Sequence, residues 1–407
     1  MPKDSKTTLT PKLRFPEFQD EPGWQTKRLD EVCTTITQGG TPDTSVAEYW
    51  NGDVCWLTPA EMGKSDTPFV DTTERKITEE GLRNCSSTLL PINTVILSTR
   101  APIGHLSINR VPMAINQGCK GLIPSSEFDF RFLYFRLLAS RHRLNDLGSG
   151  NTFKELSGSA LKTFSTTFPR QAEQQKIAEC LSTLDELIEW ESRKLDALKD
   201  HKKGLMQQLF PREGETRPRL RFPAFRDAPE WAVTPLREVC SLQAGRFVRA
   251  SEIRERYEVG LYPCYGGNGL RGYTTTFTHD GAFPLVGRQG ALCGNVKFCT
   301  GTFHATEHAL VATPKTGIDA KWLYYALDFL NLNRFATGQA QPGLSVDVLE
   351  KVQLTAPGKE DEQHRIASCL SSFDDLIAAQ SDKLEALRAH KRGLMQRLFP
   401  NPSELDS

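Results

Sequence analysis

A 40-residue segment occurs twice in this chain and decides its fold. Residues 172–211 read AEQQKIAECLSTLDELIEWESRKLDALKDHKKGLMQQLFP, and residues 361–400 read DEQHRIASCLSSFDDLIAAQSDKLEALRAHKRGLMQRLFP. By direct count about 24 of the 40 positions are identical, which is far above chance and marks an internal repeat. The chain is therefore expected to consist of two tandem halves.

Each copy of the segment predicts one long helix with a narrow apolar stripe. Apolar residues recur at alternating four- and three-residue steps, and a proline ends each copy. At about 1.5 Å per residue, such a helix would span roughly 57 Å. The stripe of the first copy consists of Ile177, Leu181, Leu184, Ile188, Leu195, Leu198, Leu205 and Leu209, with Glu191 and Lys202 as polar interruptions.

We expect the two helices to pack on each other as an antiparallel coiled coil, because a pseudo-two-fold axis would relate the two halves. A strict narrow stripe favours a helical partner over a globular surface. The alternative is that each helix lies separately on its own domain.

The segments between the helices predict two homologous α+β domains. Short β-rich runs broken by Gly and Pro are followed by one amphipathic helix near 131–146 or 319–335. Trp24 and Trp231 follow Pro-rich connectors and are expected to anchor the start of each domain. The predicted boundaries are 1–23 (connector), 24–170 (first domain), 171–211 (first helix), 212–230 (connector), 231–358 (second domain), 359–400 (second helix) and 401–407 (tail).

Composition sets mild limits on function. The chain has 407 residues, 50 basic and 50 acidic side chains, and ten cysteines without a CxxC pair. No apolar run is long enough to span a membrane and the first residues lack an apolar export signal, so we expect a cytoplasmic protein with reduced thiols. A net charge of zero argues against nucleic-acid binding, although it leaves room for a local basic groove.

The contrast between the repeated helices and the divergent domains carries a functional inference. Two near-identical helices should offer the same outer face to two identical partners, whereas two divergent domains should meet two different ligands. The simplest ligand of that kind is an asymmetric two-part target with a fixed spacing. DNA half-sites fit this description, because duplex DNA repeats about every 34 Å.

The order of domain, long helix, domain, long helix resembles the specificity (S) subunit of Type I restriction-modification enzymes. The residues that carry the resemblance are Trp24 with 29–42 (LDEVCTTITQGGTP), 96–108 (ILSTRAPIGHLSI), 116–122 (NQGCKGL), 262–273 (YPCYGGNGLRGY), and the openings of the two helices, EQQKIAECLSTLDELI and EQHRIASCLSSFDDLI. The resemblance covers nearly the whole chain, from about residue 11 to 400.

The resemblance implies that the two inserted segments are target recognition domains, each of which reads one half of a bipartite double-stranded DNA site. The helices would set the spacing and dock two modification (methyltransferase) subunits. The chain itself would bind no cofactor and no metal and would not be an enzyme. S-adenosylmethionine would come with the methyltransferase subunits, and ATP and Mg²⁺ with the restriction subunits.

Candidate DNA contacts follow from side-chain chemistry. Arg pairs with guanine, Gln and Asn pair with adenine, and hydroxyls and Lys suit phosphates. Arg100 and Arg288 are expected to occupy matching positions after a strand. The candidates are Gln38, Thr41, Ser98, Thr99, Arg100, Gln117 and Lys120 in the first domain, and Arg246, Asn268, Arg271, Arg288, Gln289 and His304 in the second.

Two other functions are weighed against DNA reading. Asp43, Glu74 and Lys76 could form a metal-dependent nuclease site, with carboxylates on Mg²⁺ and a lysine near the attacked phosphate. A coiled-coil scaffold that binds only proteins is the other alternative, and it predicts no salt-sensitive affinity for DNA.

Overall fold

The chain forms two compact units, each of which contains parts that lie far apart in the sequence. The computed structural model describes residues 9–64, 67–100, 102–148, 155–290, 292–338 and 342–400. Unit 1 comprises Met1–Lys194 and Ser381–Ser407, and unit 2 comprises Leu195–Gln380. Each unit therefore contains one inserted domain, a part of one long helix and a part of the other.

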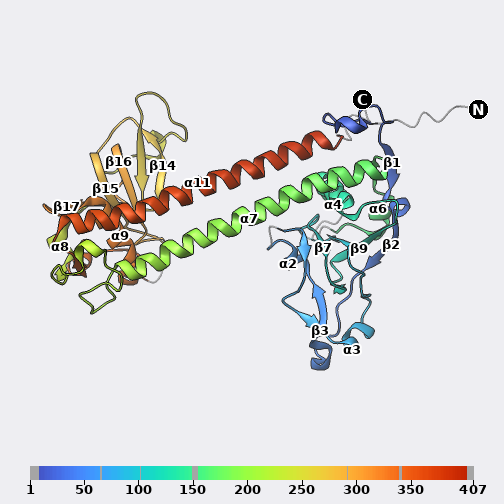
Figure 1. The fold of residues 1–407 in the computed structure, drawn as a ribbon, viewed down its shortest axis with the longest axis horizontal. Coiled ribbons are helices and arrows are strands. Elements are labelled where there is room, and N and C mark those ends of the chain that lie inside the picture. The colour runs from blue at the N-terminus through green and yellow to red at the C-terminus, as the bar shows by residue number, and fades with distance from the viewer. Residues whose placement is uncertain are drawn as a thin grey trace, which may run out of the picture. The chain divides into compact units, whose positions relative to one another are not determined.

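The two predicted long helices are present, and both are labelled in Figure 1. Helix α7 spans Gln171–Leu209 and helix α11 spans Glu360–Leu398, with 39 residues in each. Each helix ends within two residues of the proline that was expected to stop it, because proline has no N–H to donate and its ring clashes with a preceding turn. The periodicity of the repeat thus identified both elements and their ends.

Within unit 1 the helices pack antiparallel. Asp185 of α7 forms an ion pair with Lys391 of α11, and Glu191, further along α7, pairs with Lys383. The partner numbers fall on α11 as they rise on α7, so the two helices run in opposite directions here. The polar break predicted at Glu191 is buried, and its charge is matched by the lysine on the facing helix.

Unit 2 contains the equivalent pairing. Lys202 of α7 lies 2.5 Å from Asp374 of α11, and the ring of His201 stacks on Phe373 at a centroid distance of 5.0 Å. Lys202 was predicted to interrupt the apolar stripe of the first copy, and Lys391 stands at the equivalent position of the second copy. Both interruptions therefore meet an aspartate on the other helix.

The inserted domain of unit 1 is built from three small sheets and short helices. The sheets have the strand orders β2-β9-β6-β7-β4, β5-β3-β8 and β1-β10. Its elements are β1 (Gln25–Arg28), α1 (Leu29–Val32), β2 (Cys33–Gln38), β3 (Trp50–Leu57), α2 (Pro59–Met62), β4 (Phe69–Val70), β5 (Lys76–Ile77), α3 (Glu79–Arg83), β6 (Val95–Ser98), β7 (Leu106–Asn109), β8 (Met113–Ile115), β9 (Cys119–Pro124), α4 (Phe130–Ala139), α5 (Arg141–Asp146), α6 (Gly158–Thr163) and β10 (Ser165–Phe168).

The inserted domain of unit 2 merges the corresponding strands into one larger sheet. That sheet has the strand order β12-β17-β15-β16-β13-β14, and β11 pairs with β18. Its elements are β11 (Ala232–Pro235), α8 (Leu236–Val239), β12 (Cys240–Ala244), β13 (Tyr262–Gly266), β14 (Gly269–Thr274), β15 (His279–Gly287), β16 (Val296–Ala305), β17 (Ala309–Pro314), α9 (Ala320–Phe329), α10 (Val346–Leu349) and β18 (Gln353–Ala356). Both domains are α+β, as predicted.

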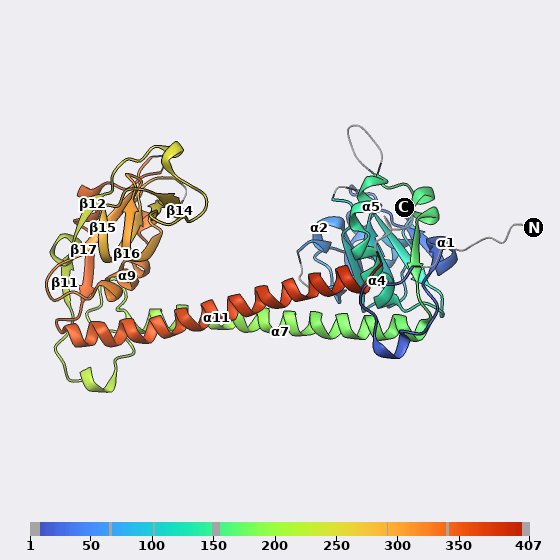
Figure 2. The same ribbon diagram turned by 90° about the horizontal axis from the view of Figure 1, so that it is seen from above.

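The core of unit 1 joins the domain to both long helices. Trp24 is fully buried, and its ring lies 5.6 Å from Phe132 of α4 and 6.1 Å from Phe399, just beyond α11. Figure 2 shows α4 beside the C-terminal part of α11. The aromatic residues of α4 thus belong to the core, and Trp24 anchors the domain as expected. Trp231 has the same role in unit 2, where it packs on Phe210.

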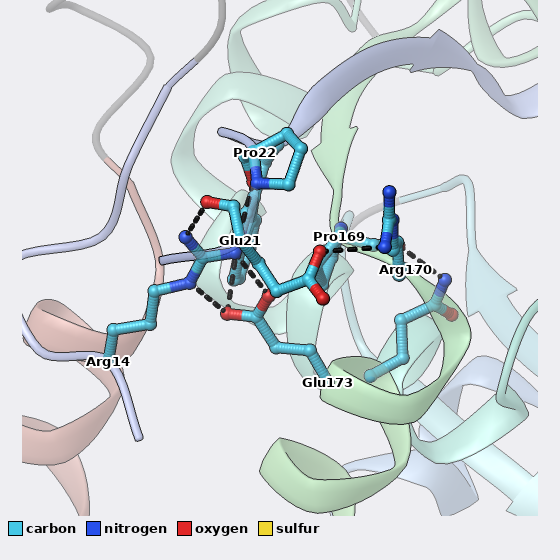
Figure 3. A network of polar contacts seen from close by, with 8 residues as sticks. Arg14, Glu21, Pro22, Pro169, Arg170 and Glu173 are labelled. Atoms are coloured by element: carbon cyan, nitrogen blue, oxygen red, sulfur yellow. Dashed lines mark hydrogen bonds and ion pairs between the residues drawn. The ribbon is translucent and has the colours of Figure 1, made fainter. Parts of the chain in front are cut away.

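A buried arginine–glutamate pair fastens the N-terminal connector to the start of α7 (Figure 3). The guanidinium of Arg14 donates two hydrogen bonds to Glu173, at 2.8 and 2.7 Å, and two more to the carbonyl oxygens of Glu21 and Pro22. The indole N–H of Trp24 donates to the same carboxylate at 3.2 Å. Bidentate, charge-assisted bonds of this kind are strong and directional. We call Arg14, Trp24 and Glu173 the first clamp.

Unit 2 repeats this arrangement. Arg221 donates to both oxygens of Glu362, at 2.7 and 2.8 Å, and to the carbonyl oxygens of Ala228 and Pro229. Trp231 donates to Glu362 at 3.2 Å, as Trp24 does to Glu173. Arg221, Trp231 and Glu362 form the second clamp.

The two connectors also make the same backbone contact with the end of a long helix. In unit 2 the N–H of Leu220 donates to the carbonyl of Gln208 in α7, at 2.9 Å. In unit 1 the N–H of Leu13 donates to the carbonyl of Arg397 in α11, also at 2.9 Å. The first connector therefore packs against the end of α11 as the second connector packs against the helix that it directly follows.

Candidate nucleic-acid interface

Most of the predicted DNA contacts in unit 1 lie where three chain segments meet at the ends of strands. The N–H of Gly40, after β2, donates to the carbonyl of Ile115 at 2.9 Å, and the N–H of Thr99, after β6, donates to the carbonyl of Gly118 at 2.8 Å. The carbonyl of Thr99 accepts from Leu156 at 2.8 Å. We call residues 38–41, 98–100 and 116–120 the first strand-end cluster.

Unit 2 has the same backbone network at its own strand ends. Arg246 N–H donates to Ala305 at 2.8 Å, and Arg288 N–H donates to His308 at 2.9 Å. The carbonyl of Arg288 accepts from Leu344 at 2.9 Å. We call residues 244–247, 287–289 and 306–310 the second strand-end cluster. The two networks match bond for bond, so they align the two domains independently of side-chain identity.

One glycine in each cluster is required by this close approach of backbones. A Cβ atom on Gly39 would lie 2.0 Å from the carbonyl oxygen of Asn116, and one on Gly245 would lie 2.1 Å from that of Ala305. Neither position can accept a side chain without moving the backbone. The loops that follow these glycines are therefore held tightly, and they present the next side chains from a fixed position.

The backbone network corrects the predicted match between Arg100 and Arg288. Thr99 and Arg288 make the equivalent hydrogen bonds, so Arg288 corresponds to Thr99, and Gln289 corresponds to Arg100. Isolated bridges support this shift by one residue, because Arg100 pairs with Glu155 and Gln289 pairs with Gly343. The prediction was wrong because the two arginines were aligned by residue type, whereas the hydrogen bonds fix the register.

In the first cluster, three of the predicted contacts are buried within the protein: Ser98, Thr99 and Lys120. Ser98 and Thr99 are both fully buried. The hydroxyl of Ser98 donates to the carbonyl of Pro102 at 2.7 Å and accepts from the N–H of His105, while the hydroxyl of Thr99 donates to Gly118 at 3.2 Å. Both side chains therefore hold the loop and do not face solvent.

The other members of the first cluster differ in exposure, since Gln38 is exposed whereas Lys120 is only 8% exposed. Arg100 is half exposed and pairs with Glu155 at 3.2 Å. Lys120 donates to the side-chain oxygen of Gln38 at 2.9 Å, and burial lowers the pKa of its ammonium, an effect that Glu155 partly opposes. A desolvated ammonium has more to gain from a nearby phosphate than a fully hydrated one.

A second polar group lies in the same cluster. The hydroxyl of Thr41 hydrogen-bonds the side-chain oxygen of Gln117 and accepts from the amide of Asn116 at 3.0 Å. Asn116 also accepts from the N–H of Gly118 at 2.8 Å. Asn116 was not among the predicted residues, although its place between Ile115 and Gln117 in the NQG stretch was visible in the sequence.

The second cluster presents more cationic side chains. Arg246 is exposed, and among the described residues no hydrogen bond or ion pair engages the guanidinium of Arg288. The exposed Gln289 lies 2.9 Å from Nδ1 of His308, which is also exposed. Asn268 and Arg271 lie nearby on the β13–β14 hairpin, since a Cβ on Gly267 would lie 3.6 Å from the backbone of Arg288.

His304 is in the protein interior. It is 4% exposed, its Nδ1 lies 3.0 Å from the hydroxyl of Thr276, and its Nε2 lies 3.0 Å from the carbonyl of Arg246. Both ring nitrogens are engaged, so this histidine supports the Arg246 loop. Phe247, which sequence reasoning missed, is 71% exposed at the position that corresponds to Thr41. Aligning the sequence on Gly39 and Gly245 would have identified it.

The residues of the alternative nuclease site are engaged locally. The carboxylate of Asp43 accepts from the hydroxyl and N–H of Ser45, and these bonds lower its pKa. Glu74 pairs with Lys64 at 2.5 Å. Within the described ranges, no three His, Cys, Asp or Glu side chains gather as a metal ion would require. No helix among the described residues is long and apolar enough to cross a membrane.

Comparison with known proteins gives a consistent result over nearly the whole chain. A family profile for the Type I restriction modification DNA specificity domain matches residues 21–200 and again residues 229–389. The specificity subunit of the Type I restriction enzyme EcoprrI from Escherichia coli is 32% identical over 350 residues, which cover 84% of this chain and 85% of that one. The MjaIX specificity subunit from Methanocaldococcus jannaschii is 36% identical over 189 residues, covering 46% of this chain and 44% of that one.

A solved structure shares the fold at low sequence identity. The S subunit of a Type I restriction-modification system from M. genitalium superimposes with a TM-score of 0.67 at 17% identity, covering 97% of this chain and 100% of that one. The chain therefore belongs to the family of Type I restriction modification DNA specificity domains, and it carries two copies of that domain in tandem.

Proposed function

We propose that this chain is the DNA-reading subunit of a Type I restriction-modification enzyme and that it performs no catalysis itself. Each strand-end cluster would contact one half of an asymmetric bipartite site in double-stranded DNA. The observation that carries this proposal is the repeated backbone network with different side chains on it. Two equal scaffolds with unequal surfaces are what an asymmetric two-part target requires.

The chemistry of the two clusters favours different contacts. Among the described residues, no hydrogen bond or ion pair engages the guanidinium groups of Arg246, Arg271 and Arg288 in unit 2, so they can form bidentate bonds with guanine or approach phosphates. Unit 1 offers Gln38, Gln117 and Thr41, whose amides and hydroxyl suit adenine and phosphate, with Arg100 and Lys120 as its cations. Unit 2 would therefore read the more guanine-rich half-site.

The outer faces of the long helices would bind the partner subunits. Leu187 on α7 and Leu376 on α11 occupy equivalent repeat positions and are 40% and 53% exposed, respectively. Equal apolar residues on equal helices suit two copies of one partner, the modification (methyltransferase) subunit. Those subunits would bring S-adenosylmethionine, the restriction subunits would bring ATP and Mg²⁺, and the complex would act on DNA in the cytoplasm.

Selection of binding sites from random duplex DNA tests this function. The chain is reconstituted with its methyltransferase subunits and S-adenosylmethionine, and the retained DNA is sequenced. We expect a two-part motif with constant spacing. Recovery of no motif, with the partners demonstrably bound, would favour the protein-only scaffold. Mg²⁺-dependent cutting by the isolated chain, abolished by Asp43→Ala, would instead support the nuclease.

The same selection tests whether the helices set the spacing. Inserting seven residues at the same repeat position in α7 and α11 keeps the apolar stripe in phase and lengthens each helix by roughly 10 Å. We expect the preferred spacing to increase by about three base pairs while both half-site sequences stay unchanged. An unchanged spacing would show that the helices are not the ruler.

A further inference from the structure

Helix α4 of unit 1 and helix α9 of unit 2 are equivalent, yet at one buried position they differ in charge. Asp129 and Asp319 cap the two helices, and their backbone N–H groups donate to Gln174 at 3.1 Å and to Gln363 at 2.8 Å. Counting from these caps, Arg136 in α4 corresponds to Ala326 in α9. Unit 1 therefore buries a cation where unit 2 buries a methyl group.

The guanidinium of Arg136 is not fully satisfied by the protein. The residue is 1% exposed, and its Nε donates to the hydroxyl of Thr166 at 2.6 Å. Its Nη2 is buried and has no hydrogen-bond partner among the described residues. The ring of Phe399 lies 5.7 Å from the guanidinium carbon, and this contact offsets only part of the cost of burying a charge.

The electrostatic surroundings make this burial more costly. Burial, together with the smaller effect of the nearby charge of Arg143, lowers the pKa of Arg136 to about 9. The side chain is still a cation at neutral pH. Ser140, one helical turn after Arg136, adds a buried hydroxyl without a partner among the described residues, and Leu330 stands at that position in unit 2.

Arg136 lines a cavity of about 480 Å³ in unit 1. The wall also contains Lys12 of the connector, His142 of α5, and Gln396 and Phe399 at the end of α11. No Asp or Glu of the described chain lines this cavity. The described wall of the cavity is therefore rich in donors and positive groups, and the cavity lies where the connector, the domain and α11 meet.

We propose that this cavity binds an oxyanion, a phosphate or a carboxylate, that pairs with the guanidinium of Arg136. A guanidinium offers several donors in one plane, which suits the paired oxygens of either group. The anion would supply the missing countercharge and connect α4 to the end of α11. Two sources have this chemistry: a free phosphate, or the carboxylates of Glu404 and Asp406, which follow Pro400 of the cavity wall in the sequence.

The test measures thermal unfolding of the full chain as phosphate replaces chloride at constant ionic strength, with phosphorus NMR line widths as a direct probe of binding. We expect a saturable rise of roughly 3 °C or more in wild type. Arg136→Met should remove this rise. Arg83→Met, which changes an exposed arginine elsewhere in unit 1, should retain it and so control for general effects of phosphate on stability.

The source of the anion is distinguished by a chain carrying Glu404→Gln and Asp406→Asn. If the chain's own carboxylates fill the cavity, wild type will not respond to phosphate, whereas this double variant will. Equal responses of wild type and Arg136→Met, or no response from wild type and the double variant, would overturn the proposal. The phosphate titration of wild type and the double variant decides the matter even if Arg136→Met fails to fold.

Discussion

Unit 1 and unit 2 share the contacts that hold each fold together and differ in the side chains that each fold presents. The clamps of Arg14 with Glu173 and of Arg221 with Glu362 match donor for donor. At the strand-end clusters the backbone bonds match equally well, but Arg288 stands where unit 1 has Thr99. The two halves are thus one scaffold used twice, with different side chains at a few positions on it.

The largest expected effect comes from breaking a clamp. Glu173→Gln leaves the guanidinium of Arg14 buried without its countercharge, which we expect to cost about 3 to 5 kcal/mol in the free energy of unfolding of unit 1. Glu362→Gln should cost unit 2 the same amount. Denaturant unfolding followed by tryptophan fluorescence measures both, since Trp24 and Trp231 donate to these carboxylates.

Equal losses of unfolding free energy in Glu173→Gln and Glu362→Gln would show that the two clamps contribute equally to stability. A loss of less than about 1 kcal/mol in one variant, beside a full loss in the other, would mean that the two clamps are alike in geometry but not in energy. Glu230→Gln, at an exposed glutamate that accepts from the hydroxyl of Thr216, serves as the control and should change stability little.

The next effect concerns a position at which the units differ. Arg288→Ala should weaken binding to the cognate site by about 1 to 3 kcal/mol if the guanidinium reads a base, and far less on random DNA. Thr99→Ala, the equivalent change in unit 1, should leave affinity nearly unchanged because Thr99 is buried. Fluorescence anisotropy with the reconstituted complex measures both changes.

The losses of affinity that Arg288→Ala causes on cognate and on random DNA assign the role of Arg288. Equal losses on cognate and random DNA would make it a phosphate contact, and no loss on either would remove it from the interface. Arg237→Ala, an exposed arginine on α8 that is paired with Glu238, is the matched control. A loss there as large as that of Arg288 would show that the effect is one of overall charge.

The architecture could be predicted from the sequence because its signals are local. The four-and-three spacing of Ile177, Leu181 and Leu184 is a property of neighbouring residues, and it correctly predicted α7 and α11. The clamps could not be predicted in this way. Arg14 and Glu173 are 159 residues apart, and no pattern in the sequence links them.

Most of the predicted contacts gather in the two strand-end clusters, but neither their register nor their exposure could be predicted. Ser98 ends β6, Thr99 follows it and His304 lies in β16, and all three are buried, with their hydroxyls and ring nitrogens bonded to nearby backbone or side-chain groups. Polar residues in loops can support a surface or form it, and sequence alone does not separate the two. The match of Arg100 with Arg288 failed for a related reason, since side-chain identity is a weaker guide than hydrogen bonding.

A smaller effect is expected where the two units differ in the contact between the inserted domain and a long helix. In unit 2 the hydroxyl of Tyr325 donates to Asp374 at 2.5 Å. Tyr325→Phe should destabilise unit 2 by about 1 kcal/mol, because Asp374 is one-third exposed and keeps its ion pair with Lys202. Denaturant unfolding measures the change, and Tyr262→Phe at a partly exposed ring is the control. A loss above about 3 kcal/mol would show that water does not replace the lost donor.

The smallest effect comes from the reverse change in unit 1, where Phe135 stands at the position of Tyr325. One carboxylate oxygen of Asp185, the equivalent of Asp374, is buried there without a partner among the described residues. Burial raises the pKa of Asp185, although Lys391 opposes this. A raised pKa in the folded state means that the protonated acid is favoured, so unit 1 loses stability as pH rises through that pKa.

Phe135→Tyr should supply the missing donor and stabilise unit 1 by under about 1 kcal/mol at neutral pH. The phenol bonds best to the charged carboxylate, so it lowers the pKa of Asp185. The loss of stability of unit 1 with rising pH is then smaller than in wild type. The gain should therefore shrink as pH falls below the raised pKa of Asp185, where the acid is protonated in both proteins. Unfolding of wild type and variant across the acid range measures this, and a gain that does not change with pH would assign it to packing of the added hydroxyl instead of to the Asp185 charge.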